Sequence, residues 1–67
     1  MGKVKMRYSV YDNKTGYFTK YRTMTVKMDI ITNSQGFILF DSNFKKCEEI
    51  ATKIINIPFK VISFQII

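Results

Sequence analysis

An alternating stretch that runs into a turn near the N-terminus constrains this chain more than any other feature. Between residues 3 and 11, apolar and polar side chains alternate, which is the pattern of a strand buried on one face. The apolar members are Val4, Met6, Tyr8 and Val10. The next five residues, Asp12-Asn13-Lys14-Thr15-Gly16, are typical of a turn, and a second β-prone stretch begins at Tyr17. The sequence therefore predicts a β-hairpin.

The second stretch, Tyr17 to Ile31, is longer than a typical strand of about 5–6 residues, and its apolar phase changes midway. Up to Tyr21 the residues expected to face inward are odd-numbered, and from Met24 onward they are even-numbered. A β-bulge near Arg22-Thr23 would produce this one-residue shift within a single long strand. Two short strands separated by a kink are the alternative.

A second turn, a short strand and a helix are expected next. Thr32-Asn33-Ser34-Gln35-Gly36 has turn composition, and the apolar run Phe37 to Phe40 predicts a short interior strand. Asp41-Ser42-Asn43 then offers three candidate N-caps. Apolar residues recur beyond them at spacings of three and four, which predicts an amphipathic helix ending near Asn56 because Pro58 follows. These residues are Phe44, Cys47, Ile50, Ala51, Ile54 and Ile55.

The last stretch, Phe59 to Ile67, is apolar on both faces of the strand it predicts. Such a strand on an exposed edge would favour aggregation, so we expect it to be paired on both sides or to lie at a dimer seam. A single helix covers one face of a sheet and leaves the other bare. A homodimer through Phe59–Ile67 is therefore predicted.

These segments predict one small α+β domain spanning residues 1–67, with the order β-β-β-α-β. The sheet is expected to be mostly antiparallel and twisted, with the helix packed on one face. A chain of 67 residues buries only about 60% of its unfolded surface, and the high apolar content, 46%, compensates for this small size. Folding alone and folding as a dimer both remain open.

Several kinds of chemistry lack the residues they need. The sequence contains no histidine and one cysteine, so it has no histidine triad, no imidazole acid–base group and too few thiols for a structural zinc site. Cys47 falls on the apolar side of the predicted helix, where a small core residue is expected rather than a nucleophile. We predict that the protein is not an enzyme and has no cofactor and no metal site.

Localisation is inferred from the same composition. A single cysteine rules out an internal disulfide framework, and no apolar run approaches the about 20 residues of a membrane span. No signal peptide and no myristoylation motif are visible at the N-terminus. We therefore expect a cytoplasmic protein with no membrane partner.

The charge of the chain, +6 with 11 basic and 5 acidic residues, favours an anionic partner. Abundant lysine also arises from AT-rich coding, which is the alternative explanation. In the predicted hairpin register, Val10 lies opposite Tyr17, and the outward face pairs Arg7 with Lys20 and Lys5 with Arg22. The candidate nucleic-acid-binding residues are Lys3, Lys5, Arg7, Tyr11, Lys14, Lys20 and Arg22.

Three functions are compatible with this basic surface. The leading prediction is a non-enzymatic module that binds nucleic acid, DNA in particular, through the cationic hairpin face. In element order alone, the predicted β-β-β-α segment is similar to the arm-type DNA-binding modules of phage-type integrases, without any of their diagnostic motifs. The alternatives are a phage- or mobile-element-type protein that binds an acidic host protein and inhibits or modulates it, and a homodimeric accessory protein.

Overall fold

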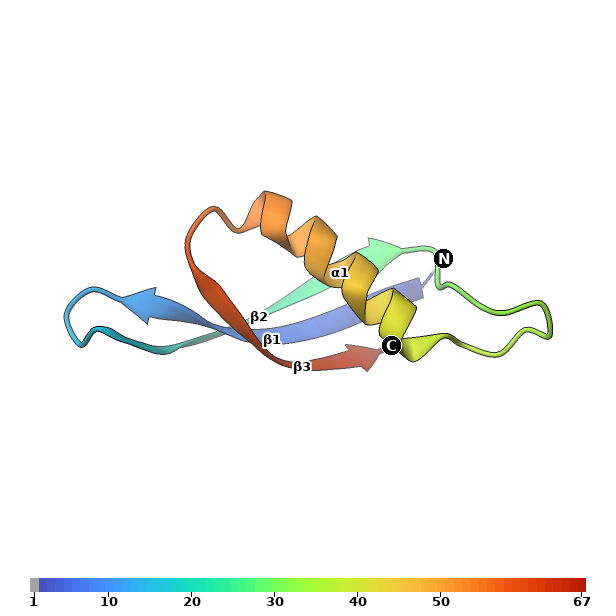
Figure 1. The fold of residues 1–67 in the computed structure, drawn as a ribbon, viewed down its shortest axis with the longest axis horizontal. Coiled ribbons are helices and arrows are strands. Elements are labelled where there is room, and N and C mark those ends of the chain that lie inside the picture. Colours follow the sequence, from blue (N-terminus) through green and yellow to red (C-terminus); the bar gives the residue numbers. More distant parts are fainter. Residues whose placement is uncertain (1) are drawn as a thin grey trace.

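The protein, described by a computed structural model over residues 2–67, is built from three strands and one helix. The elements are β1 (Gly2–Asp12), β2 (Tyr17–Met28), α1 (Phe40–Ile54) and β3 (Phe59–Ile66). The strands form one antiparallel sheet in the order β2-β1-β3, and α1 lies across one face of it (Figure 1). The predicted α+β class is confirmed, with β1 as the central strand.

The hairpin of β1 and β2 is present, and the turn between them has the predicted chemistry. The carboxylate of Asp12 accepts a hydrogen bond from the backbone N–H of Lys14 at 2.9 Å. The N–H of Gly16 donates to the Asp12 carbonyl at 2.8 Å, and Gly16 has φ 77°, a conformation that glycine adopts without strain. All four residues predicted to face inward on β1, from Val4 to Val10, are buried.

β2 is a single strand with an irregularity, as expected, but the irregularity lies closer to the turn. Val10 lies opposite Lys20, whereas the next residue, Tyr11, lies opposite Phe18, so Thr19 is the extra residue of a bulge. The predicted position near Arg22-Thr23 was wrong. Tyrosine suits either face of a strand, so Tyr17 and Tyr21 did not define the phase of this segment.

A second bulge, in β3, places most of the apolar side chains of that strand on its covered side. Arg7 lies opposite Ser63 and Tyr8 opposite Val61, which leaves Ile62 without an opposite residue. The shift turns four apolar side chains toward α1, on both sides of the bulge. They are Phe59, Val61, Phe64 and Ile66. The expectation of apolar residues on both faces was therefore wrong for these four, while Ile62 and Ile67 stay 47% and 65% exposed. Within residues 2–67, β3 lies at an edge of the sheet and is not paired on both sides, as one of the two expected arrangements required.

The predicted strand at Phe37–Phe40 is not formed. Thr32 and Ile38 make an isolated antiparallel bridge, and Phe40 already belongs to α1, so the order of elements is β-β-α-β. The similarity in element order to the integrase modules is lost with this strand. The loop closes through the side chain of Asn33, which accepts hydrogen bonds from Gln35 and Phe37.

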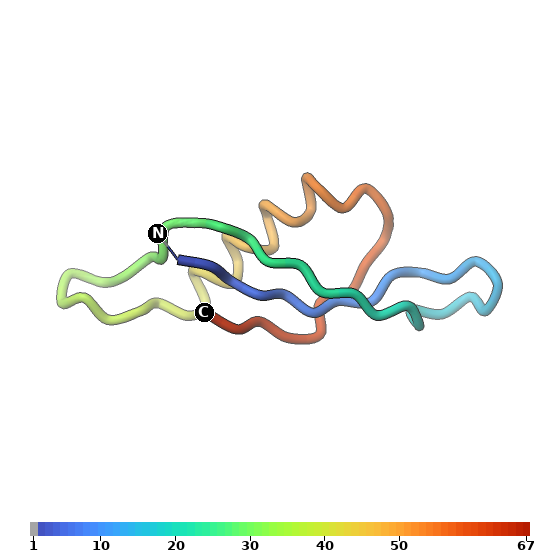
Figure 2. Tube along the Cα trace, turned by 180° about the vertical axis from the view of Figure 1, so that it is seen from behind, coloured from blue at the N-terminus to red at the C-terminus, as the bar shows by residue number. Residues whose placement is uncertain are grey.

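The molecule is elongated, measuring 49 × 17 × 15 Å, because both loops extend beyond the helix-covered centre. The hairpin turn projects at one end, and the loop between β2 and α1 projects at the other (Figures 1 and 2). The last turn of α1 rises away from the strands in both views, and Ile54, predicted to be inward, is 63% exposed.

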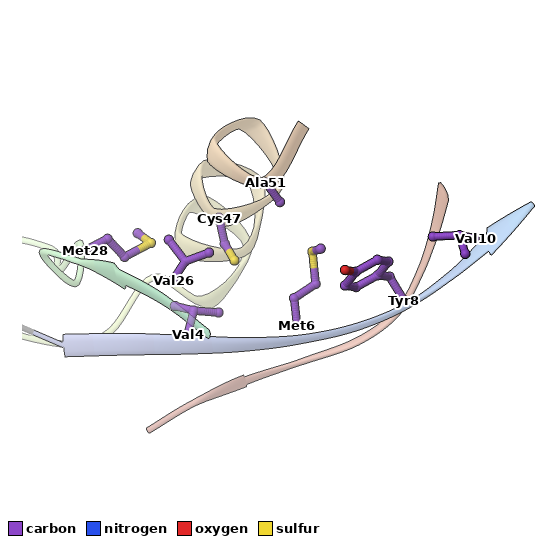
Figure 3. Close-up of a cluster of buried hydrophobic side chains, with 8 residues drawn as sticks. All are labelled: Val4, Met6, Tyr8, Val10, Val26, Met28, Cys47 and Ala51. Carbon is purple, nitrogen blue, oxygen red and sulfur yellow. The ribbon is translucent and has the colours of Figure 1, made fainter. Parts of the chain in front are cut away.

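The core lies between α1 and the covered face of the sheet, as Figure 3 shows. Cys47 and Ala51 of α1 are fully buried against side chains of β1 and β2. The rings of Phe44 and Phe64 stack with centroids 4.8 Å apart and an angle of 6°, which joins α1 to β3. The burial predicted for Cys47 is confirmed.

Asn43 has a different role from the capping that was predicted for Asp41, Ser42 or Asn43. The helix begins earlier, with Leu39 as N-cap, and it has no side-chain cap. The fully buried Asn43 side chain accepts a hydrogen bond from the N–H of Ile31 at 2.7 Å. It also donates to the carbonyls of Ile31 and Leu39, at 3.0 and 2.7 Å. This amide fastens the loop after β2 to the start of α1.

We expect Asn43→Ala to lower the free energy of unfolding by about 1–3 kcal/mol, because the N–H of Ile31 would lose its partner in a partly buried site. The carbonyl of Ile31 would keep the N–H of Leu39. Urea unfolding followed by circular dichroism measures this change.

Thr52→Ala is the matched control for Asn43→Ala. Its hydroxyl donates to the Glu48 carbonyl at 2.8 Å on the exposed side of α1, where water replaces the bond. A change within about 0.5 kcal/mol is expected. Equal stabilities of the two variants would show that the buried amide does not hold the loop.

Candidate nucleic-acid interface

The open face is the face of the sheet opposite α1. It carries most of the basic residues of the strands. Residues directly opposite one another in an antiparallel pair share a face, so the register assigns each side chain to one side. On β1 the odd-numbered residues lie on the open face, since Val4, Met6, Tyr8 and Val10 are buried on the side that α1 covers. The open-face residues are Lys3, Lys5, Arg7, Ser9, Tyr11, Phe18, Tyr21, Thr23, Thr25, Lys27, Lys60, Ser63 and Gln65.

Two of the predicted site residues lie on the other side of the sheet. Lys20 is opposite Val10 and Arg22 is opposite Tyr8, so both share the covered face beyond the end of α1. The predicted pairs Arg7–Lys20 and Lys5–Arg22 are therefore wrong. The observed register of β1 and β2 differs from the predicted one by three residues, because Met24, Val26 and Met28 pack toward α1 and determine which residues of β2 face the core.

The remaining predicted residues divide between the open face and the turn. Lys3, Lys5, Arg7 and Tyr11 follow one another along β1 on the open face, as predicted. Lys14 is exposed in the hairpin turn, where its N–H binds Asp12, and it belongs to neither face of the sheet.

Lys27 and Lys60 complete the basic surface and were missed in the sequence. Lys27 lies directly opposite Lys3, and Lys60 lies opposite Ser9. Their positions depend on register between strands that are distant in sequence. A signal for Lys27 was present, since it alternates with the apolar residues Val26 and Met28 and must therefore point away from them.

The open face thus gathers five cations and no carboxylate. Within residues 2–67, none of the five acids occupies an open-face strand position: Asp12 shares the covered side with Tyr17, and the other four lie outside the strands. The Lys3–Lys27 pair places like charges opposite each other, which costs stability on the order of a few tenths of a kcal/mol. The basic face therefore carries a small structural penalty.

Aromatic side chains occupy the end of the open face nearest the hairpin turn. Tyr11 and Phe18 make an edge-to-face contact with ring centroids 5.6 Å apart. The ammonium of Lys60 lies 4.7 Å from the centre of the Phe18 ring, a cation–π distance. Tyr21 is 69% exposed beside Ser9 on the same face. The face is therefore cationic along β1 and aromatic at the hairpin.

Other groups with chemical potential are buried or scattered. Burial, with a smaller contribution from Glu48, raises the pKa of the Cys47 thiol, which disfavours the reactive thiolate. Within residues 2–67 no group of three or more His, Cys, Asp and Glu residues is placed to hold a metal ion. The one helix in the described part of the chain has 15 residues and is neither long nor apolar enough to cross a membrane.

Comparisons with protein-family models, with curated proteins and with solved structures find no match to this chain.

We expect Lys27→Glu to raise the free energy of unfolding by about 0.2–1 kcal/mol at low salt, because it replaces the like-charge pair with Lys3 by an opposite-charge pair. The gain should shrink at high salt, where exposed charges are screened. Urea unfolding at two salt concentrations measures both effects.

Lys20→Glu is the control for Lys27→Glu. It makes the same charge change on the same strand, but opposite Val10 instead of a cation. Both variants lower the net charge equally, so the difference between them isolates the cross-strand pair. If Lys20→Glu stabilises the protein as much as Lys27→Glu does, the pair has no cost of its own.

Proposed function

We propose that this protein is a small, non-enzymatic module that binds nucleic acid through the open face of its sheet. The observation that carries the proposal is the concentration of five cations on that face without a carboxylate among them. A surface of this kind attracts a polyanion at long range and neutralises several phosphates at contact. The proposed role is binding without catalysis, because the chain has no histidine and its one thiol is buried.

The length of the face suits a phosphate backbone. From Lys3 to Tyr11 the central strand advances eight residues, about 26 Å at about 3.3 Å per residue. Lys3, Lys5 and Arg7 stand at every second residue along this line, and Lys27 and Lys60 flank it on the neighbouring strands. Lysine and arginine contacts of this kind supply affinity that depends on salt and carries little sequence information.

We expect a double substitution, Lys5→Ala with Arg7→Ala, to weaken binding to duplex and single-stranded oligonucleotides alike. Each lost phosphate contact should reduce the slope of log K against log salt by about 0.9 on duplex DNA and about 0.7 on single strands. Fluorescence anisotropy across a salt series measures the affinity and the slope.

The matched control is Lys20→Ala with Arg22→Ala, which removes one lysine and one arginine from the other face of the sheet. It changes the net charge by the same amount, so a general loss of charge affects both double variants equally. The larger loss should follow the Lys5 and Arg7 substitutions. Absence of binding by the unmodified protein to either form of nucleic acid at low salt would refute the proposed function.

A protein partner along β3 is the second candidate, and the open edge of that strand favours it. Both β2 and β3 are edge strands with one bulge each, but β2 is protected by three cations, Lys20, Arg22 and Lys27. β3 carries one charge, Lys60, over its eight residues. We propose that a second copy of the chain pairs along this edge, in the homodimer through Phe59–Ile67 that the sequence predicts.

Sedimentation at micromolar concentration tests this pairing, and the expected mass is twice the 7.9 kDa of one chain. Ile62→Lys should shift the protein to monomer, because Ile62 is 47% exposed at the bulge of β3 and a charge there disfavours edge pairing. Ile54→Lys, at an exposed position on α1, should leave the mass unchanged. A monomeric unmodified protein would refute the dimer.

A further inference from the structure

Tyr21 differs from the other aromatic residues of the open face because its ring is free. Within residues 2–67 it makes no ring–ring or cation–π contact of the kind that Tyr11 and Phe18 make. It is 69% exposed, and it stands directly across from Ser9, which is nearly buried. A large apolar ring held on a strand and open to solvent has surface available for a flat ligand.

The neighbours of Tyr21 on the open face are cations. Lys60 is the partner of Ser9 on the opposite side of β1, so Tyr21, Ser9 and Lys60 form one row across the three strands. Arg7 is the next open-face residue along β1. The open face thus offers the ring of Tyr21 for a base. Lys60 in the same row and Arg7 in the next row offer positive charges for phosphates.

We propose that the open face binds single-stranded nucleic acid, with an unpaired base stacked on Tyr21 and its flanking phosphates against Arg7 and Lys60. This inference rests on the proposed function and specifies its ligand. Bases in a duplex are stacked on one another, so their faces are closed to a side chain, whereas those of a single strand are open. Base–aromatic stacking combined with a cationic track is the usual basis of single-strand binding with little sequence preference.

Electrostatics alone gives the opposite preference. A duplex carries a denser array of phosphates than a single strand and gains more from each neutralised contact. A basic face without stacking would therefore bind duplex at least as well as a single strand. Tighter binding of the single strand isolates the contribution of the bases.

The experiment compares fluorescently labelled oligonucleotides of about 12 nucleotides, within the about 4–16 nucleotides that single-strand binding modules cover. Four probes are titrated at one salt concentration: single-stranded DNA, single-stranded RNA of the same sequence, the DNA duplex, and a DNA backbone lacking bases. We expect tighter binding to at least one of the two base-bearing single strands than to the duplex, with the DNA and RNA titrations showing which sugar is preferred. The backbone without bases should bind more weakly than single-stranded DNA.

Tyr21→Ala should weaken binding to the preferred single strand by about five- to 150-fold, the range that corresponds to stacking of one base. Tyr21→Phe keeps the ring and should bind normally. Tyr21→Leu keeps apolar bulk without a ring and should behave as Tyr21→Ala does, which preserves the test if the alanine variant folds poorly. Tyr21→Ala should not alter binding to the backbone that lacks bases.

Tyr17→Ala is the matched control. Tyr17 lies on the same strand and is 70% exposed, but it shares the covered side of the sheet with Asp12. This substitution should leave single-strand binding unchanged. Equal losses from the Tyr17 and Tyr21 substitutions, or duplex binding as tight as single-strand binding, would overturn the inference while leaving the proposed function standing. Failure to bind any of the four probes would refute both.

Discussion

The central position of β1 is the constraint on which the rest of the structure depends. Within residues 2–67 it is the one strand paired on both sides, and its side chains alternate between the core and the open face. Val4, Met6 and Val10 are buried against the helix side, while Lys3, Lys5 and Arg7 emerge on the other. A shift of one residue would exchange the two sets. The hydrophobic core and the basic surface are therefore two consequences of one alternation.

Two bulges adapt the outer strands to this central strand. The extra residue Ile62 lets β3 place Phe59 and Val61 on the same side as Phe64 and Ile66. The polar residues Lys60, Ser63 and Gln65 then lie together on the open face. The bulge at Thr19 changes the phase of β2 near the turn. It brings Phe18 onto the open face with Tyr11.

The helix is attached to the rest of the molecule from Asn43 to Ala51, and its last turn is not. Asn43 binds the loop that follows β2, Phe44 stacks on Phe64 of β3, and Cys47 is buried against the sheet. The last turn lies farther from the strands, and Ile54 is largely exposed. This arrangement leaves the hairpin beyond α1 with little cover. Its aromatic residues are accordingly held by one another and by Lys60.

Sequence by itself determined the elements whose signals are local. The alternation from Val4 to Val10, the turn from Asp12 to Gly16 and the spacing of the helix are set by neighbouring residues, and each appears in the structure. The side of β1 that carries the cations was also determined, because buried and exposed residues alternate along one strand. The tyrosines of β2 gave no such signal, since they suit either face.

Only the tertiary structure decided which residues from different strands share the open face. A side chain lies on the open face or on the covered face according to the register of its strand with β1. That register depends on the positions of the bulges and on the packing of Met24, Val26 and Met28 against α1. Lys20 and Arg22 were assigned to the wrong face for this reason, and Lys27 and Lys60 were overlooked. Alternation is a property of one strand, whereas the alignment of three strands is settled by the core that they bury together.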